Sequence, residues 1–190
     1  MYEYETYQPL RDIANAAVRS QINTEFPARV LVTAAACESA WFTKVTGANN
    51  FYGITRLPEA GLAKLCATHE DITPAQLESF DPRERATAVQ GADLGGGRFR
   101  YQMQRYFAVY QSMGESVVAY TEFFTKSPHR YAAAWQAYLE DKDEEGLLKA
   151  ICEAGYATGD AETTEVAIFE QSNVDHAIQM AQKANAVPTT

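Results

Sequence analysis

Glu38 is an acidic residue at the end of an apolar run, residues Val30 to Cys37. Pro27 suits the first turn of a helix, and the glycine and asparagines of residues 47–50 mark an exit region. The spacing therefore predicts a helix from Pro27 to about Trp41, with Glu38 in or near its last turn. Burial on an apolar helix and the negative end of the helix dipole both raise the pKa of a carboxyl group there. A carboxyl group that stays protonated near neutral pH can act as a general acid.

The same position also fits a structural acid, hydrogen-bonded to the backbone or paired with Arg or Lys. Helical spacing places Leu31, Ala34, Ala35 and Trp41 on the side of Glu38, so that the acid shares its face with an aromatic ring. This helix alone leaves both interpretations of Glu38 open, and the segments that follow it distinguish between them.

Length and composition predict one globular domain, residues 1–184, followed by a frayed tail, residues 185–190. The chain has 190 residues, of which 46% are hydrophobic, enough to bury a sizeable core. No apolar stretch is long enough to cross a bilayer. The N-terminus lacks the basic start and apolar core of a secretory signal, so we expect a mature chain, a piece of a larger protein, or export by another route.

The formal net charge of −9 argues against nucleic acid as a partner, because such proteins carry a basic face. It also makes tight electrostatic capture of an anionic polymer unfavourable. A polysaccharide would instead be held by aromatic stacking and neutral hydrogen bonds in a cleft. We favour a monomer.

The cysteines and histidines suggest neither a disulfide framework nor a metal site. Cys37, Cys66 and Cys152 form no C-x-x-C pair, and we expect buried thiols, with one disulfide as the alternative. The histidines, which are His69, His129 and His176, are scattered, and Ser39 has no adjacent histidine or glycine elbow. No metal and no cofactor are predicted.

The organisation predicted along the chain is helices, then a small sheet, then more helices. Glycines and prolines from Phe51 to about Tyr110 limit that stretch to short elements and a β lobe. Alternation predicts a strand over 98–109, paired antiparallel with Leu65 to Ile72, which puts Glu70 on one face of the sheet. Between them, Thr73 to Gln90 predicts one or two short helices with Thr73 as a cap.

The last third is predicted to be helical. Ser112 with Glu115 predicts a capping box, and Asp141 with Glu144 predicts the start of a helix that stops at Gly155. A further helix starts near Thr163 or Thr164 and carries Val166, Phe169, Ile178 and Ala181. The predicted class is mainly helical α+β, with Glu38 where the first helices meet the sheet. A cleft between such lobes can bind an extended polymer.

Five segments in register resemble motifs of one known family, and together they span about Arg11 to Ile178. They are Glu38-Ser39-Ala40-Trp41 with Asn49-Asn50-Phe51-Tyr52-Gly53-Ile54, Thr68-His69-Glu70, Phe107-Ala108-Val109-Tyr110-Gln111-Ser112 with Tyr120, Arg130-Tyr131-Ala132, and Ala154-Gly155-Tyr156-Ala157-Thr158. They are similar to Glu-Ser-Gly-Trp with Asn-Leu-Phe-Gly-Ile, Thr-x-Glu, Phe-x-x-Tyr-x-Ser, Arg-Tyr and Ala-Gly-Tyr-Ala-Thr-Asp. These motifs belong to the glucosaminidase family of peptidoglycan hydrolases, glycoside hydrolase family 73, which includes autolysins and the flagellar rod-associated hydrolase.

The resemblance implies a lysozyme-like α+β fold and hydrolysis of the β-1,4 bond between N-acetylglucosamine and N-acetylmuramic acid. Glu38 matches the family's catalytic acid, and a protonated carboxyl group there would deliver a proton to the leaving oxygen. Glu70 matches the acid of the β lobe, as base on a water or as stabiliser of the oxocarbenium-like state. Asp71, Glu59 and the substrate's own N-acetyl group are alternatives, and a solvated strand residue is the plain interpretation of Glu70.

Six other residues are candidates for binding substrate. Tyr156 matches the family tyrosine near the acid and would orient the substrate or the carboxyl group. The aromatic residues Trp41, Phe51, Tyr52 and Tyr131 are candidates for lining a sugar cleft, although a core position is the alternative for each and the stronger one for Trp41 and Trp135. Asn50 would cap a turn or contact the acetamido group.

Departures from the family pattern are Ala40 and Phe42 in place of glycines, Gly159-Asp160 in place of Asp-Pro, and a long stretch from Asp71 to Gly97 that could reshape the upper wall of the cleft. The rival functions are a muramidase or lytic transglycosylase on the same fold, and a non-catalytic wall-binding or assembly module. The expected place of action is the bacterial cell wall, in the periplasm, outside the cell or delivered by a phage.

Overall fold

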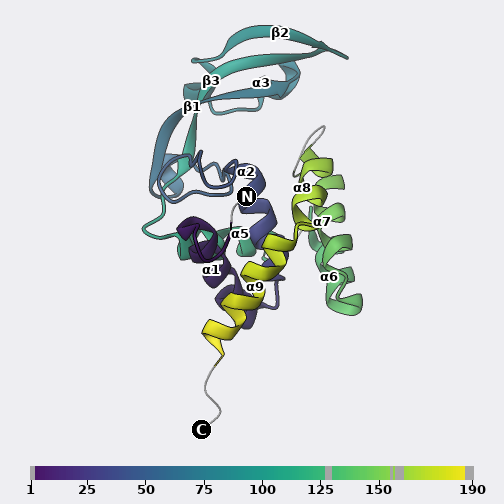
Figure 1. Cartoon of the computed structure of the whole chain (residues 1–190). Coiled ribbons are helices and arrows are strands. Elements are labelled where there is room, and N and C mark those ends of the chain that lie inside the picture. Colours follow the sequence, from purple (N-terminus) through teal and green to yellow (C-terminus); the bar gives the residue numbers. More distant parts are fainter. Residues whose placement is uncertain (1–2, 127–129, 155, 157–160, 187–190) are drawn as a thin grey trace.

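The computed structural model describes residues 3–126, 130–154, 156 and 161–186, and it divides into a helical lobe and a β lobe (Figure 1). The elements in chain order are α1 (Gln8–Thr24), α2 (Ala28–Glu38), a 3₁₀ turn (Pro58–Ala60), β1 (Ala63–Ile72), α3 (Pro74–Glu78), α4 (Pro82–Arg85), β2 (Val89–Gly95), β3 (Arg98–Ala108), α5 (Met113–Thr125), α6 (Ala132–Asp141), α7 (Glu144–Glu153), α8 (Ala161–Phe169) and α9 (Ser172–Asn185). The mainly helical α+β class predicted from the sequence is confirmed.

Helix α2 lies at the centre of the helical lobe and packs against α1, α5, α7, α8 and α9. Its apolar residues from Val30 to Ala36 are all buried, as is Thr33 among them. A helix that is apolar on every side is stable only where other helices cover every side. The composition of this run therefore explains the central position of α2.

The final helix expected from the sequence is in fact two helices, α8 and α9, with a break at residues 170–171. The guanidinium group of Arg29 on α2 donates hydrogen bonds to the carbonyl oxygen of Phe169 at 2.7 and 3.0 Å, and it forms an ion pair with Asp175 at 3.1 Å. Arg29 thus satisfies a carbonyl group at the end of α8 that has no partner within the helix. This long-range contact has no local sequence signal.

The caps of two helices differ from those expected. The hydroxyl of Ser112 accepts a hydrogen bond from the N–H of Glu115, as expected, but the carboxylate of Glu115 accepts from the N–H of Gln111 and does not close a capping box. Asp143 caps α7, whereas Asp141 belongs to the end of α6. Gly155, the expected stop of α7, lies outside the described residues, as do Pro128, His129 and residues 187–190.

The β lobe is a three-stranded antiparallel sheet in the order β1-β3-β2. The predicted pairing of β1 with β3 is confirmed, with Glu70 opposite Tyr101 and Thr68 opposite Met103. Thr73 caps α3 in a capping box, so short helices do follow β1. Strand β2 was not predicted, because all its side chains are exposed and its glycines hide any alternation.

The three cysteines are free thiols. Cys152 is buried, as expected, but Cys37 and Cys66 are only partly buried. Within the part of the chain that the structure describes, no helix is both long and apolar enough to span a membrane.

Helix α2 ends at Glu38, three residues before the predicted end, in a left-handed turn. The N–H of Trp41 donates to the carbonyl oxygen of Ala36 at 2.7 Å, and the N–H of Ala40 donates to that of Cys37 at 3.2 Å. This is the Schellman pattern, in which a left-handed residue, usually glycine, closes the helix. Here Ala40, Trp41 and Phe42 have φ angles of 47°, 56° and 67°. Three consecutive non-glycine residues therefore hold a conformation that costs an L-residue roughly 1–2 kcal/mol each.

We expect Ala40→Gly to stabilise the protein by about 1 kcal/mol, because glycine adopts a φ of 47° without the strain that a Cβ atom causes. The free energy of unfolding from urea denaturation measures the effect. Ala137→Gly, at an exposed position inside α6, is the matched control and should lower the stability by about 1 kcal/mol. A loss of stability in both variants would contradict the strain at Ala40.

Candidate functional site

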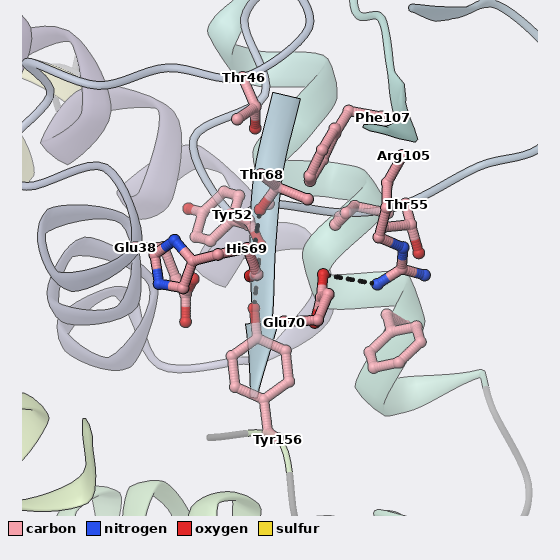
Figure 2. Close-up of a pocket in the computed structure, with 13 residues that line it drawn as sticks. Glu38, Thr46, Tyr52, Thr55, Thr68, His69, Glu70, Arg105, Phe107 and Tyr156 are labelled. Atoms are coloured by element: carbon pink, nitrogen blue, oxygen red, sulfur yellow. Dashed lines mark hydrogen bonds and ion pairs between the residues drawn. The ribbon is translucent and has the colours of Figure 1, made fainter. Parts of the chain in front are cut away.

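A pocket of about 550 Å³ lies where the end of α2 meets the β lobe (Figure 2). Its walls come from α2, the loop after it, strands β1 and β3, α5, and the segment that follows α7. The lining residues are Glu38, Thr46, Tyr52, Gly53, Ile54, Thr55, Thr68, His69, Glu70, Arg105, Phe107, Phe123 and Tyr156. The structure thus brings together four residues singled out from the sequence, namely Glu38, Glu70, Tyr52 and Tyr156.

Glu38 is the last residue of α2, and its side chain leaves the apolar core to face the pocket. Solvent reaches this side chain through the pocket mouth, but the surrounding walls displace much of the water around the carboxyl group. A Cβ atom on Gly53 would lie 3.6 Å from its Oε2 atom, so this glycine backs directly onto the acid. Loss of hydration raises the pKa of Glu38 from its ordinary 4.5 to about 7, and the negative charge of Glu165 adds to the rise.

Glu165 is a second acid of the helical lobe, and sequence reasoning did not single it out. It lies on α8 with a fully buried side chain, and its Oε2 atom accepts a hydrogen bond from the thiol of Cys152 at 2.8 Å. The same signal that identified Glu38 was available here, because Glu165 is an acid followed by the apolar residues Val166, Ile168 and Phe169. A buried carboxylate on a helix packed against α2 favours the protonated form of Glu38.

Glu70 projects from β1 into the pocket and is held by an ion pair. Its Oε1 atom accepts a hydrogen bond from Arg105 of β3 at 3.0 Å, and each side chain retains about a quarter or less of its exposure (Figure 2). Arg105 lies in turn 3.5 Å from the buried carboxylate of Glu84 on α4, and its guanidinium group stacks on Phe80 at 4.4 Å. The segment between β1 and β2 therefore fixes the direction of Glu70 through Arg105.

Tyrosine side chains support the pocket on the side of the helical lobe. The hydroxyl of Tyr156 donates to the carbonyl oxygen of Tyr52 at 3.2 Å (Figure 2). The hydroxyl of Tyr52 donates in turn to the carbonyl oxygen of Leu31 at 3.2 Å. The ring of Tyr120 stacks on that of Tyr52 with centroids 4.1 Å apart. Burial raises the pKa of both tyrosines, Tyr52 and Tyr156, so they remain protonated hydrogen-bond donors.

The other four candidate residues do not line this pocket. Asn50 is buried, donates to the carbonyl oxygens of Ile54 and Ala108, and accepts from the N–H of Ile54, so it closes a turn. Phe51 and Tyr131 are buried in the aromatic core, and Trp41 packs partly buried against Phe42. The structure gives these residues packing or turn positions, and their contact with a sugar stays a prediction.

Several lining residues were missed at the level of sequence. These residues are Arg105 and Phe107 on β3 and Thr55 on a loop. For Arg105 the reason is plain, because the sequence of a strand does not show whether a polar side chain faces solvent or a pocket. His69 lines the pocket as well, although no role was predicted for it. Among the described residues, no group of three or more His, Cys, Asp and Glu side chains is placed to hold a metal ion. The matched positions Gly155 and Ala157 to Asp160 lie outside the described residues.

The arrangement is suited to acid-assisted cleavage of a bond inside a cleft. One carboxyl group, Glu38, holds its proton near neutral pH, and the second, Glu70, keeps a cation beside it. Two carboxyl groups in such different surroundings can divide the roles of proton donor and of base or charge stabiliser.

Residues 14–184 match the family model described as "Glucosaminidase: Mannosyl-glycoprotein endo-beta-N-acetylglucosaminidase". The fold is similar to that of a peptidoglycan hydrolase mutant from Sphingomonas sp. A1, with a TM-score of 0.60, 16% identity, and coverage of 89% of this chain and 96% of that one. The catalytic domain of the autolysin Auto from Listeria monocytogenes has a TM-score of 0.61 and 17% identity, with coverage of 88% of this chain and 84% of that one. The glycoside hydrolase domain of FlgJ from Salmonella typhimurium has a TM-score of 0.57 and 16% identity, with coverage of 93% of this chain and 94% of that one. No curated protein matches the sequence.

We expect the stability of the wild type to fall relative to Glu38→Gln as the pH rises from about 4.5 to 7. The folded state has the higher pKa and binds this proton more tightly than the unfolded state, so the stabilisation is complete below pH 4.5 and is lost as the pH passes 7. Because solvent reaches Glu38, the relative loss should be only ~1–2 kcal/mol. Urea denaturation of both proteins at pH 4.5 and 8 measures it, and parallel pH profiles would contradict the raised pKa.

Proposed function

Because this chain belongs to the glucosaminidase family of glycoside hydrolases, we propose that it cleaves the β-1,4 glycosidic bonds of peptidoglycan as an endo-β-N-acetylglucosaminidase. The observation that carries the proposal is the pair of carboxyl groups in the pocket, with the pKa of Glu38 at about 7 and Glu70 ion-paired to Arg105. The lysozyme-like fold, shared with a peptidoglycan hydrolase and with the catalytic domain of an autolysin, supports it. The place of action that we propose is the bacterial cell wall.

Glu38 acts in this proposal as the general acid. Cleavage of a glycosidic bond leaves a poor leaving group unless its oxygen is protonated as the bond breaks. A carboxyl group with a pKa of about 7 is about half protonated at pH 7, against a small fraction for an ordinary glutamate, and it is still acidic enough to transfer its proton. Burial of the rest of α2 holds the donor in place, so little motion is needed to reach the substrate.

Glu70 acts in this proposal on the sugar ring that develops positive charge. Its carboxylate either activates a water molecule or stabilises the oxocarbenium-like state, while Arg105 fixes its orientation. The N-acetyl group of the substrate can share this task by attacking the anomeric carbon itself. In that case Glu70 contributes to the rate without being indispensable.

Two rival functions lead to different observations. A muramidase or a lytic transglycosylase would use the same acid on the neighbouring linkage. A non-catalytic wall-binding module would have no use for a carboxyl group whose surroundings keep it protonated, and the surroundings of Glu38 therefore favour an enzyme.

We expect Glu38→Gln to abolish lysis of purified peptidoglycan while the fold stays intact, because an amide cannot deliver the proton. Loss of turbidity measures the activity, and circular dichroism with thermal unfolding checks the fold. Glu140→Gln, on the exposed face of α6, is the matched control and should keep full activity. Undiminished lysis by Glu38→Gln would refute the proposal.

Glu70→Gln tests the second group in the same assay. We expect a loss of about 10²-fold or more if Glu70 is the sole second group, and a smaller loss if the acetamido group of the substrate takes part. Wild-type rates for Glu70→Gln would remove Glu70 from the mechanism and leave Glu38 as the single protein acid.

The linkage that is cut can be read from the products. We expect mass spectrometry of digested peptidoglycan after borohydride reduction to find N-acetylglucosamine at the new reducing ends. N-acetylmuramic acid at those ends would indicate a muramidase, and its anhydro form a lytic transglycosylase.

A further inference from the structure

A second hollow, of about 220 Å³, adjoins the pocket of Glu38 on the β-lobe side. The two hollows share Thr55 and Arg105 as lining residues, so they form a continuous surface. Arg56, the residue after Thr55, lines the second hollow and also a third, shallower one that runs along α5. A ligand that leaves the first pocket past Thr55 therefore meets Arg56 next.

The side chain of Arg56 is partly buried and held in place by its neighbours. Its guanidinium group lies 5.2 Å from the ring centroid of Tyr110 and donates a long hydrogen bond of 3.5 Å to the hydroxyl of that residue. Its other side rests on Gly61, where a Cβ atom would come within 3.3 Å of the Arg56 side chain. The conformation of this cation is thus set before any ligand arrives, which lowers the entropic cost of binding.

The acids that line the hollows beside Arg56 are engaged by other groups. In the third hollow, Glu122 pairs with Lys126, and Glu115 accepts a hydrogen bond from the N–H of Gln111. Of the acids that line the second hollow, Asp81 pairs with Arg83 at 2.8 Å, and Glu84 pairs with Arg105 and accepts from the N–H of Tyr106. Within the described residues, no carboxylate lies at ion-pair distance from Arg56. Arg56 itself lines two hollows that a ligand can enter.

We propose that Arg56 binds a free carboxylate of the peptide stem that hangs from the glycan strand next to the bond being cut. This inference rests on the proposed function. In peptidoglycan the sugars themselves are uncharged, and the anionic groups are the carboxylates of the stem peptides attached to N-acetylmuramic acid. A guanidinium fork is the side chain best matched to a carboxylate, with two parallel N–H donors. The site makes the enzyme selective for glycan that still carries its stems.

The test compares two glycans: purified peptidoglycan fragments with intact stems, and the same fragments stripped of stems by an N-acetylmuramoyl-L-alanine amidase, with the lactyl carboxylates that the amidase exposes then converted to amides. For Arg56→Gln we expect kcat/KM on the intact fragments to fall by about tenfold, mostly through KM, with no change on the stripped glycan. Arg56→Lys should keep part of the preference, because the charge remains and the fork is lost. Arg19→Gln, an exposed arginine on α1, is the matched control and should leave both rates unchanged.

Binding decides the inference independently of catalysis. In the Glu38→Gln background, we expect intact fragments to bind more tightly than stripped ones, and fragments with chemically amidated carboxylates to bind like stripped ones. Addition of Arg56→Gln should remove the difference. If Arg56→Gln lowered the affinity for both glycans equally, or for neither, the proposed stem site would be wrong. A wild type that releases no reducing ends from either glycan would refute the proposed function, and the binding comparison would still show whether Arg56 recognises the carboxylates.

Discussion

The burial of α2 from Val30 to Ala36 is the constraint on which the rest of the structure depends. The apolar residues Val30 to Ala36 require cover on every side, and five helices provide it. The first polar side chain that can leave this packing is that of Glu38, at the last position of the helix. The chain then turns at once through three left-handed residues and passes into the loop whose Gly53 backs onto the carboxyl group. The position of the acid is therefore a consequence of core packing.

In the β lobe, Arg105 holds the second carboxyl group, that of Glu70, in position. It joins Glu70 of β1 to Glu84 of α4 and is covered by the ring of Phe80. The segment from Asp71 to Gly97, which looks too long for a hairpin in the sequence, thus supplies the groups that hold the second carboxylate and adds strand β2 to the sheet. This segment forms the wall beyond the pocket, and it is where the hollow beside Arg56 is found. The same segment therefore contributes to both features.

The sequence was sufficient to predict an element where the signal for that element is local or periodic. The apolar run before Glu38, the alternation of residues 98–109 and the cap at Thr73 each predicted an element that the structure contains. Prediction from the sequence failed where a long-range contact or an unusual backbone conformation determines where a helix ends. The break between α8 and α9 depends on Arg29, which is distant in the chain, and the early end of α2 depends on left-handed residues that are not glycines. Aromatic residues posed the same difficulty, because Tyr52 and Tyr156 line the pocket while Phe51 and Tyr131 fill the core, and no spacing distinguishes them.

The two carboxyl groups differ because the two lobes surround them differently. The helical lobe removes water from around Glu38 and places the charge of Glu165 near it, and both favour the neutral acid. The β lobe offers Glu70 a guanidinium group that is itself anchored by Glu84. In the proposed mechanism, a pocket at the junction of such lobes contains a proton donor on one wall and a carboxylate held by an ion pair on the other. The division of labour that glycosidic cleavage requires therefore follows from placing the site at the junction, and moving both acids onto one lobe would remove it.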